Sequence, residues 1–200
     1  MIDLKQKNLN KDYYLWKSFK EGSDDSFGEL YDQYADGLYR YGMHFSRDKD
    51  FIKDCIHDLF LDLYKYRDRL SMTDSIRFYL LRSLRRKINQ EQIKTINLIY
   101  DNNIMSSNDN QVLAFEDSII ASETEEENNR LLRKAMEKLT DRQREALSLK
   151  FEHNLTYPEI AEILDMTVES ARTAIYRALK ILRESIQEDK FSIHCYVSDR

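Results

Sequence analysis

The chain has 200 residues and a formal net charge of −5, with 42% hydrophobic and 34% charged residues. That length suits one medium domain or two small ones, and that apolar content excludes a wholly disordered chain. Glycine and proline are scarce, with 4 and 1 in the whole sequence, which excludes a turn-rich β fold and a glycine-rich phosphate loop. The composition therefore predicts an all-α protein.

Helical periodicity predicts a series of helices in the first half of the chain. They cover Tyr13–Lys20, the stretch after the expected N-cap Ser26, the stretch from Phe51 to Tyr64, and Ser75–Lys94. The helix from Phe51 is the clearest amphipathic one, because apolar pairs recur in it every four residues.

The periodicity is lost between residues 95 and 128. A polar tract rich in asparagine is followed by six acids and no base between Glu116 and Glu127. This composition predicts a flexible acidic linker with at most one short helix. We therefore expect a first helical domain at 10–94, the linker at 95–128, a second helical domain at 129–187 and a disordered tail at 188–200.

The second domain has the spacing of a helix-turn-helix. Capping boxes at Thr140 with Gln143 and at Thr156 with Glu159 mark two helix starts. A short helix, Tyr157–Leu164, is then followed by a turn and by a longer helix from Val168 to about Ile186. Four outward positions of that longer helix suit contacts with the DNA major groove, namely Ser170, Arg172, Thr173 and Arg177. A helical hairpin with a solvated basic face is the alternative interpretation.

A second basic stripe lies in the helix Ser75–Lys94. Between Arg77 and Lys94 there are six bases and one acid. Arg82, Arg85 and Arg86 fall on one helical face, and Tyr79 with Phe78 offers stacking surfaces for unpaired bases. A solvated helix face is again the alternative. The binding interpretation is favoured because the helix-turn-helix of the second domain already indicates a nucleic-acid partner.

The helix from Phe51 carries an acidic row at i, i+4 and i+8, made of Asp54, Asp58 and Asp62. Like charges at this spacing disfavour an isolated helix, so the row predicts a basic partner, with His57 and an outward Leu61 beside it. Carboxylates near a histidine also occur in metal and acid–base sites. No other helix offers an inward ligand, and we expect no metal, no cofactor and no catalytic residue.

Four stretches resemble the sigma-70 family of RNA polymerase sigma factors, in its small extracytoplasmic-function (ECF) group. The first two are "LWKSFKEGSDDSFGELYDQYADGLYRYG" and "KDCIHDLFLDLYKYRDRL". The third is "SIRFYLLRSLRRKINQE", and the fourth is "LLRKAMEKLTDRQREALSLKFEHNLTYPEIAEILDMTVESARTAIYRALKILRES". The resemblance covers about residues 13–186 apart from the linker.

The resemblance implies a non-catalytic subunit that directs core RNA polymerase to promoters. Its first domain is expected to bind the β′ coiled coil, read the minus-ten element and help melt the DNA. Its second domain is expected to bind the β flap and read the minus-thirty-five element. The implied partners are core polymerase, promoter DNA and a membrane-associated anti-sigma factor, and the implied location is the cytoplasm without membrane insertion.

The resemblance also assigns three groups of residues. The polymerase group is Asp54, His57, Asp58, Phe60 and Leu61. The minus-ten group is Tyr79, Arg82, Ser83, Arg85, Arg86 and Lys87. The minus-thirty-five group is Ser170, Arg172, Thr173 and Arg177.

Three residues depart from the family pattern. His57 stands where glutamine is usual, Arg86 where asparagine is common, and Asp165 where the turn usually has glycine, a substitution that brings strain if the turn needs a positive φ. The main rival interpretation is a stand-alone helix-turn-helix regulator whose first domain serves dimerisation or sensing. A helical adaptor without a DNA role is a third interpretation, and it leaves both basic stripes without a purpose.

Overall fold

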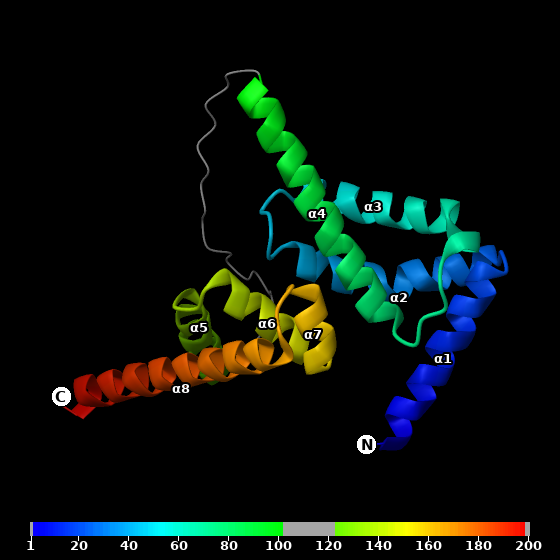
Figure 1. Ribbon diagram of the computed structural model, residues 1–200. Helices are drawn as coiled ribbons and strands as arrows, with labels where there is room; N and C mark the ends of the chain where they lie inside the picture. The colour runs from blue at the N-terminus through cyan, green and yellow to red at the C-terminus, as the bar shows by residue number, and fades with distance from the viewer. Residues whose placement is uncertain (1, 102–122, 199–200) are drawn as a thin grey trace. The chain divides into compact units, whose positions relative to one another are not determined.

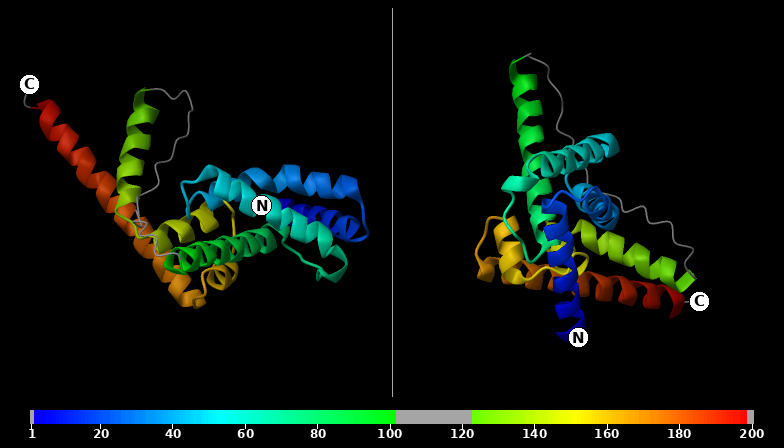
Figure 2. Two further views of the ribbon diagram at one scale, coloured as in Figure 1. Left: turned by 90° about the horizontal axis from the view of Figure 1, so that it is seen from above. Right: turned by 90° about the vertical axis from the view of Figure 1, so that its right-hand side faces the viewer.

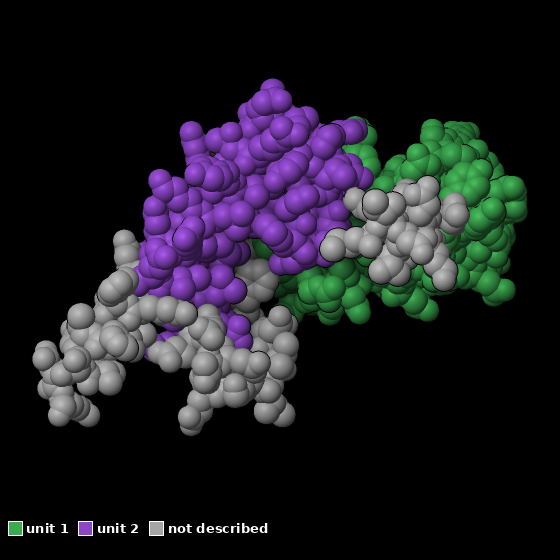
Figure 3. Space-filling model, turned by 90° about the horizontal axis from the view of Figure 1, so that it is seen from below, with its two compact units in different colours: residues 1–109 green, residues 110–200 purple. Residues whose placement is uncertain are grey.

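The computed structural model describes the backbone of residues 2–101 and 123–198, and the side chains of residues 11–96 and 129–187. Within these ranges all regular structure is helical. The chain divides into two compact units, 1–109 and 110–200, which Figure 3 distinguishes by colour. The predicted all-α architecture with two helical domains is confirmed.

Unit 1 is a bundle in which α2 contacts each of the other three α-helices (Figures 1 and 2). Its elements are α1 (Ile2–Lys20), α2 (Asp24–Gly42), α3 (Lys49–Lys65), the 3₁₀ turn η1 (Arg67–Arg69) and α4 (Ile76–Asp101). The largest fully buried side chains are Trp16, Phe19, Leu30, Tyr41, Ile52, Ile76, Leu80, Leu81, Leu84 and Ile88. The core therefore draws on all four helices, and the apolar stripes predicted from periodicity are the ones that meet.

Polar side chains start the second and third helices. Ser23 caps α2, and its hydroxyl accepts the backbone N–H of Ser26 at 3.2 Å. Ser26 was the expected cap, and it lies instead in the first turn, where its hydroxyl donates to that of Ser18. Asp48 caps α3, because its carboxylate accepts two backbone N–H groups at 3.0 Å.

Gly42 lies at the end of α2, where it packs against α3. A Cβ at this position would come within 2.5 Å of Cγ2 of Ile52, a side chain that is fully buried and stiff at χ1. We therefore expect Gly42→Ala to lower the free energy of unfolding by about 1–3 kcal/mol, the usual cost of overpacking.

Gly28→Ala is the matched control for this substitution. Gly28 lies in the same helix, and nothing stands within 4 Å of the Cβ it would gain. The control should raise the free energy of unfolding by about 0.5–1 kcal/mol through helix propensity alone. Chemical denaturation of both variants measures the difference, and two stabilised variants would show that the α2–α3 contact is loose.

Unit 2 is organised along α8, which contacts each of the other three helices (Figure 1). Its elements are α5 (Glu123–Glu137), α6 (Asp141–Phe151), α7 (Tyr157–Ile163) and α8 (Val168–Ser198). Small and aliphatic side chains fill the core, including Leu131, Ala135, Leu149, Ile160, Ala161, Ala171, Ile175 and Ala178. The small residues allow close contact between helices, as expected for Ala161.

Both predicted capping boxes are present in unit 2. The Thr140 hydroxyl accepts the N–H of Gln143 at 3.3 Å, and the Gln143 side chain accepts the Thr140 N–H at 3.0 Å. The Glu159 carboxylate accepts the Thr156 backbone N–H at 2.7 Å and the Thr156 hydroxyl at 2.6 Å. These bonds satisfy donors that a helix start otherwise leaves unpaired.

The structure departs from the expected element boundaries at the start of α1, which begins at Ile2, around the linker and at the end of α8. Helix α4 continues to Asp101, and α5 begins at Glu123, so both helices extend into the range expected to be linker. Helix α8 continues to Ser198, so residues 188–198 are helical rather than disordered. The rest of the predicted linker, 102–122, lies outside the described residues. None of the described helices is both long enough and apolar enough to cross a bilayer.

Candidate nucleic-acid interface

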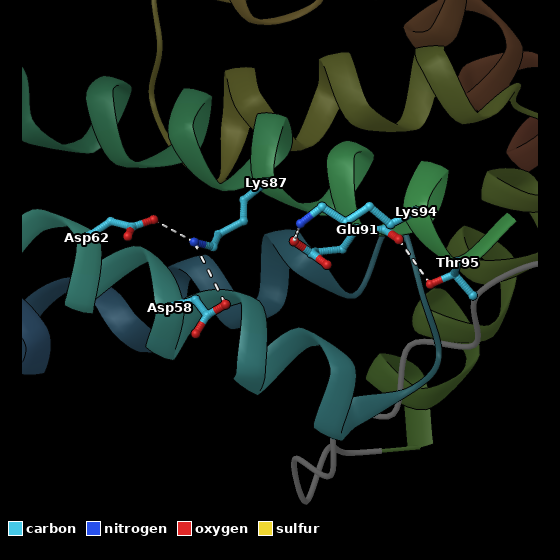
Figure 4. Close-up of polar contacts among 6 residues, drawn as sticks. All are labelled: Asp58, Asp62, Lys87, Glu91, Lys94 and Thr95. Atoms are coloured by element: carbon cyan, nitrogen blue, oxygen red, sulfur yellow. Dashed lines mark hydrogen bonds and ion pairs between the residues drawn. The ribbon is translucent and has the colours of Figure 1, made fainter. Parts of the chain in front are cut away.

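The acidic row of α3 lies on the surface of unit 1, and part of it is paired across to α4. Lys87 reaches from α4 so that its Nζ lies 2.6 Å from Oδ2 of Asp62 and 3.8 Å from Oδ2 of Asp58 (Figure 4). The Lys87 side chain is 17% exposed. Lys87 is therefore turned toward α3, where it pairs with the acidic row. Asp54, one turn earlier, is exposed.

Four of the five residues in the polymerase group share the exposed face of α3. Asp54, His57 and Asp58 are exposed, and Leu61 is 52% exposed. Phe60 is the exception, because it is 2% exposed and its ring packs against Tyr31 and Phe27 at centroid distances of 4.9 and 6.1 Å. Phe60 belongs to the core, and its assignment to the contact surface was wrong.

Aromatic side chains extend this face beyond the predicted group. Tyr64 follows Leu61 by three positions and is 41% exposed, and Tyr31 on α2 is 44% exposed. Tyr64 donates a hydrogen bond to Asp24, and the Arg67 guanidinium lies 4.7 Å from the centroid of its ring. Sequence periodicity assigned Tyr64 to an apolar pair, although its i+3 spacing from Leu61 indicates the outer face.

A pocket of about 220 Å³ lies between α3 and α4. One wall comes from α4 and includes Tyr79, Ser83 and Arg86, at the spacing of one helical face. The remaining lining residues come from α3, from the segment after it and from α4, namely Leu59, Asp62, Leu63, Tyr66, Leu70, Lys87 and Gln90. The structure thus gathers four of the six minus-ten residues around one cavity with an apolar part and a charged rim.

Arg82 and Arg85 do not line this pocket. Arg82 and Arg86 are exposed on α4, and Arg85 is half-buried. At the end of the basic stripe, Lys94 is paired with Glu91 at 2.7 Å, and this partner raises the pKa of Lys94 (Figure 4). Beside Lys87 and Lys94, the stripe presents Arg82 and Arg86 on the exposed surface of α4.

The minus-thirty-five group lies on the exposed face of α8, as predicted. Ser170, Arg172, Thr173 and Arg177 are all exposed. The hydroxyl of Ser170 lies 2.9 Å from that of Thr167, the residue that precedes the helix. Such a face presents guanidinium and hydroxyl donors at helical spacing, which suits base edges and phosphates in a major groove.

A tyrosine of α7 positions one of these arginines. The Arg172 guanidinium lies 5.4 Å from the ring centroid of Tyr157, and the Lys150 ammonium lies 4.7 Å from the same ring. Lys150 is held in turn by the carbonyl of Leu155 at 3.1 Å. The ring face attracts both cations, so Arg172 is oriented from the first helix of the helix-turn-helix.

Sequence reasoning missed Tyr176, which lies between Thr173 and Arg177 on the outer face of α8. Its side chain is 70% exposed, the largest value among the exposed large hydrophobic residues of the described chain. Leu179, three positions further along α8, is 44% exposed. The signal that identifies Tyr176 is its position three residues after Thr173 and four after Arg172, which places it on the same helical face.

The turn between α7 and α8 requires a left-handed residue. Asp165 has φ 50°, a conformation that costs free energy for a residue with a Cβ. The strain expected at this position is thus present in the structure. The guanidinium of Arg142 donates to the carbonyls of Leu164 and Asp165 at 2.9 and 3.4 Å and fixes the turn from outside.

We expect Asp165→Gly to be more stable than Asp165→Ala by about 1 kcal/mol. Both variants lose the carboxylate, and only the alanine keeps the Cβ that the left-handed backbone disfavours. Thermal and urea unfolding of the two full-length variants measure the difference. Equal stability would mean that the turn carries no strain from the Cβ.

Groups that could carry chemistry do not assemble in the described residues. Cys55 is buried, and burial raises the pKa of its thiol to about 11, so it stays protonated near neutral pH. No group of three or more histidine, cysteine, aspartate or glutamate side chains in the described ranges is arranged to hold a metal ion. The surfaces described above, on α3, α4 and α8, consist of charged and aromatic side chains that suit binding.

Comparison with known proteins agrees with this geometry. Residues 129–182 match the protein family described as sigma-70, region 4. The ECF RNA polymerase sigma factor BldN of Streptomyces coelicolor is 25% identical over 171 residues. That match covers 84% of this chain, and the chain spans 63% of the length of BldN.

Two solved structures share the fold. The sigma factor RpoE of Bartonella quintana, in complex with the anti-sigma factor NepR, has a TM-score of 0.61 at 19% identity and covers 80% of this chain and 96% of its own. CnrH, in complex with the cytosolic domain of CnrY, has a TM-score of 0.58 at 19% identity. The match covers 89% of this chain and 98% of CnrH.

Proposed function

We propose that the chain is a sigma factor of the ECF group of the sigma-70 family, which binds core RNA polymerase and directs it to specific promoters. The observation that carries the proposal is the family match over residues 129–182, which spans the whole helix-turn-helix and its exposed basic face. In this role the protein is a non-catalytic specificity subunit that acts in the cytoplasm and needs no cofactor.

The exposed face of α3 is the proposed contact with the β′ coiled coil of polymerase. Asp54, His57, Asp58 and Leu61 offer carboxylates around an exposed apolar side chain. A basic partner relieves the like-charge repulsion along the helix, while Leu61 and Tyr64 provide apolar area. The β flap is the proposed partner of unit 2.

The pocket between α3 and α4 is the proposed site for a base of the minus-ten element. A base that leaves the stack loses a few kcal/mol, which stacking and polar contacts inside a pocket offset. Tyr79 offers an aromatic ring, and Ser83 and Arg86 offer hydrogen-bond donors at the same cavity. Arg82 and Arg85 then follow the phosphates outside it.

The outer face of α8 is the proposed reader of the minus-thirty-five duplex. Arg172 and Arg177 suit bidentate contacts with guanine, and Ser170 and Thr173 suit base edges or phosphates. Tyr176 adds an aromatic side chain for apolar contact with a thymine methyl group. The orientation of Arg172 by Tyr157 reduces the freedom it loses on binding.

The charge distribution predicts that the free chain binds promoters weakly. The net charge is −5 and the chain carries two separate basic stripes, whereas phosphate neutralisation dominates the affinity for DNA. When polymerase holds both units on one promoter, the second contact becomes effectively intramolecular and gains a large effective concentration. An anti-sigma factor, membrane-associated in the cell, is the proposed regulator, because the structural relative RpoE was solved with one.

The decisive experiment is run-off transcription with core polymerase on a library of promoters. We expect the chain to co-purify with core enzyme and to select a subset of promoters, and we expect the chain alone to bind the selected duplexes weakly in a salt-sensitive way. A chain that never associates with core enzyme but binds its duplex tightly alone would instead be a stand-alone helix-turn-helix regulator.

A further inference from the structure

The segment between η1 and α4, residues 70–75, is fixed at the end that leads into α4. The hydroxyl of Thr73 accepts the N–H of Ser75 at 3.2 Å, and the hydroxyl of Ser75 accepts the N–H of Phe78 at 3.3 Å. These bonds start α4. They leave the other end of the segment, at Leu70 and Ser71, to be held by a different part of the molecule.

Helix α1 holds that other end through two side chains one turn apart. The indole N–H of Trp16 donates to the carbonyl of Ser71 at 2.9 Å. The ammonium of Lys20 donates to the carbonyl of Leu70. Trp16 is fully buried, so its N–H has no access to water as an alternative acceptor. Two consecutive carbonyls of the segment are thus tied to α1, fifty and fifty-five positions earlier in the chain.

The same tryptophan also contacts α4. Its ring lies against that of Tyr79, with centroids 5.2 Å apart. Tyr79 lines the pocket between α3 and α4, and so does Leu70, whose carbonyl Lys20 holds. Trp16 and Lys20 therefore support two walls of the pocket while neither of them lines it.

We propose that Trp16, assisted by Lys20, is a positioning residue for promoter recognition. By fixing residues 70–75 and the ring of Tyr79, α1 sets the shape of the pocket that receives an unpaired base. This inference rests on the proposed function of the pocket. It assigns to α1 a role in base selection that α1 performs without contacting DNA itself.

Trp16→Phe tests the proposal, because it keeps an aromatic ring beside Tyr79 and removes the hydrogen bond to Ser71. In the full-length protein, the segment should loosen, and hydrogen exchange at the amides of Ser75, Phe78 and Tyr79, which donate the hydrogen bonds that start α4, is expected to become about tenfold faster, the effect of losing one hydrogen bond. Exchange within α3 should not change. In the reconstituted holoenzyme, affinity for core polymerase should be retained, open-complex formation should slow, and discrimination among the four bases at the unpaired position should shrink.

Two further variants keep the test specific. Lys20→Met removes the second donor and should reproduce the effect on exchange at Ser75, Phe78 and Tyr79. Leu15→Ala is the control, because Leu15 is buried on the same helix and its aliphatic side chain donates no hydrogen bond to the segment. It should lower stability without changing base discrimination.

The proposal is overturned if Trp16→Phe leaves the exchange of Ser75, Phe78 and Tyr79 unchanged, or if Leu15→Ala reduces base discrimination as much as Trp16→Phe does. Failure of the proposed function has a different signature. In that case the wild-type chain opens no promoter with core polymerase, while the exchange effect of Trp16→Phe at Ser75, Phe78 and Tyr79 remains.

Discussion

Charge reversal at Asp54 and Asp58 together (Asp54→Lys with Asp58→Lys) is expected to weaken the binding of core polymerase by about a hundredfold or more, because each like-charge contact with a basic partner costs several kcal/mol. Run-off transcription should be lost with it. Both carboxylates are exposed on α3 beside Leu61. Exposed charges contribute little to folding, so the variant should remain folded by circular dichroism.

The two carboxylates do not have the same surroundings, and the single variants separate their roles. Asp58 lies 3.8 Å from the ammonium of Lys87, so a lysine at position 58 also disturbs the α3–α4 pair. Asp54→Lys alone tests the outer surface. Asp36→Lys, at an exposed position of α2, makes the same change in charge and serves as the control.

A fluorescence titration of labelled chain with core polymerase measures the affinity of each variant at two salt concentrations. Asp54→Lys should lose most of the affinity, and Asp36→Lys should lose little. If both reversals weaken binding equally, the effect is one of net charge and the face of α3 is not the contact. Retained affinity in Asp54→Lys would exclude that face directly.

The starts of α6 and α7 were predictable because local rules decide them. Thr140 with Gln143 and Thr156 with Glu159 are capping boxes in the sequence and in the structure. The left-handed turn at Asp165 follows from the helix-turn-helix resemblance, and its φ of 50° confirms the expected strain. The exposed face of α8 followed from helical spacing alone, because no neighbouring element covers Arg172, Thr173 or Arg177.

The surroundings that sequence reasoning could not supply depend on contacts between helices. Phe60 is adjacent to Leu59 and to the exposed Leu61, and only its packing against Phe27 and Tyr31 decides which way it turns. Lys87 was assigned to the minus-ten group from its position in the basic stripe, and the register of α3 against α4 places its ammonium 2.6 Å from Asp62. Neither distance can be read from the periodicity of one helix.

The extent of α8 was misjudged for a different reason. An end near Ile186 was expected from the loss of a clear apolar pattern, although the sequence after it contains no glycine or proline to stop the helix. The structure continues the helix to Ser198. Absence of a pattern is weaker evidence for a helix end than presence of a stop signal.

Removing both arginines of the minus-thirty-five group (Arg172→Ala with Arg177→Ala) is expected to weaken holoenzyme binding to promoter duplex by about a hundredfold or more, because each bidentate contact with a base contributes about 1–3 kcal/mol. Both side chains are exposed, and Arg172 is oriented by the ring of Tyr157. Lys180→Ala is the control. Lys180 lies on the same helix, is 62% exposed and pairs with Glu184 at 3.7 Å.

A promoter with a scrambled minus-thirty-five element separates base reading from attraction to phosphates. Contacts with bases are lost on the scrambled duplex, so the double variant and the wild type should bind it alike in anisotropy titrations. Contacts with phosphates are independent of sequence, and each one lost lowers the salt dependence of binding by about one counterion. Equal weakening on both duplexes, with a smaller salt slope, would make Arg172 and Arg177 phosphate contacts. An unchanged affinity on the intact promoter would remove α8 from the recognition of DNA altogether.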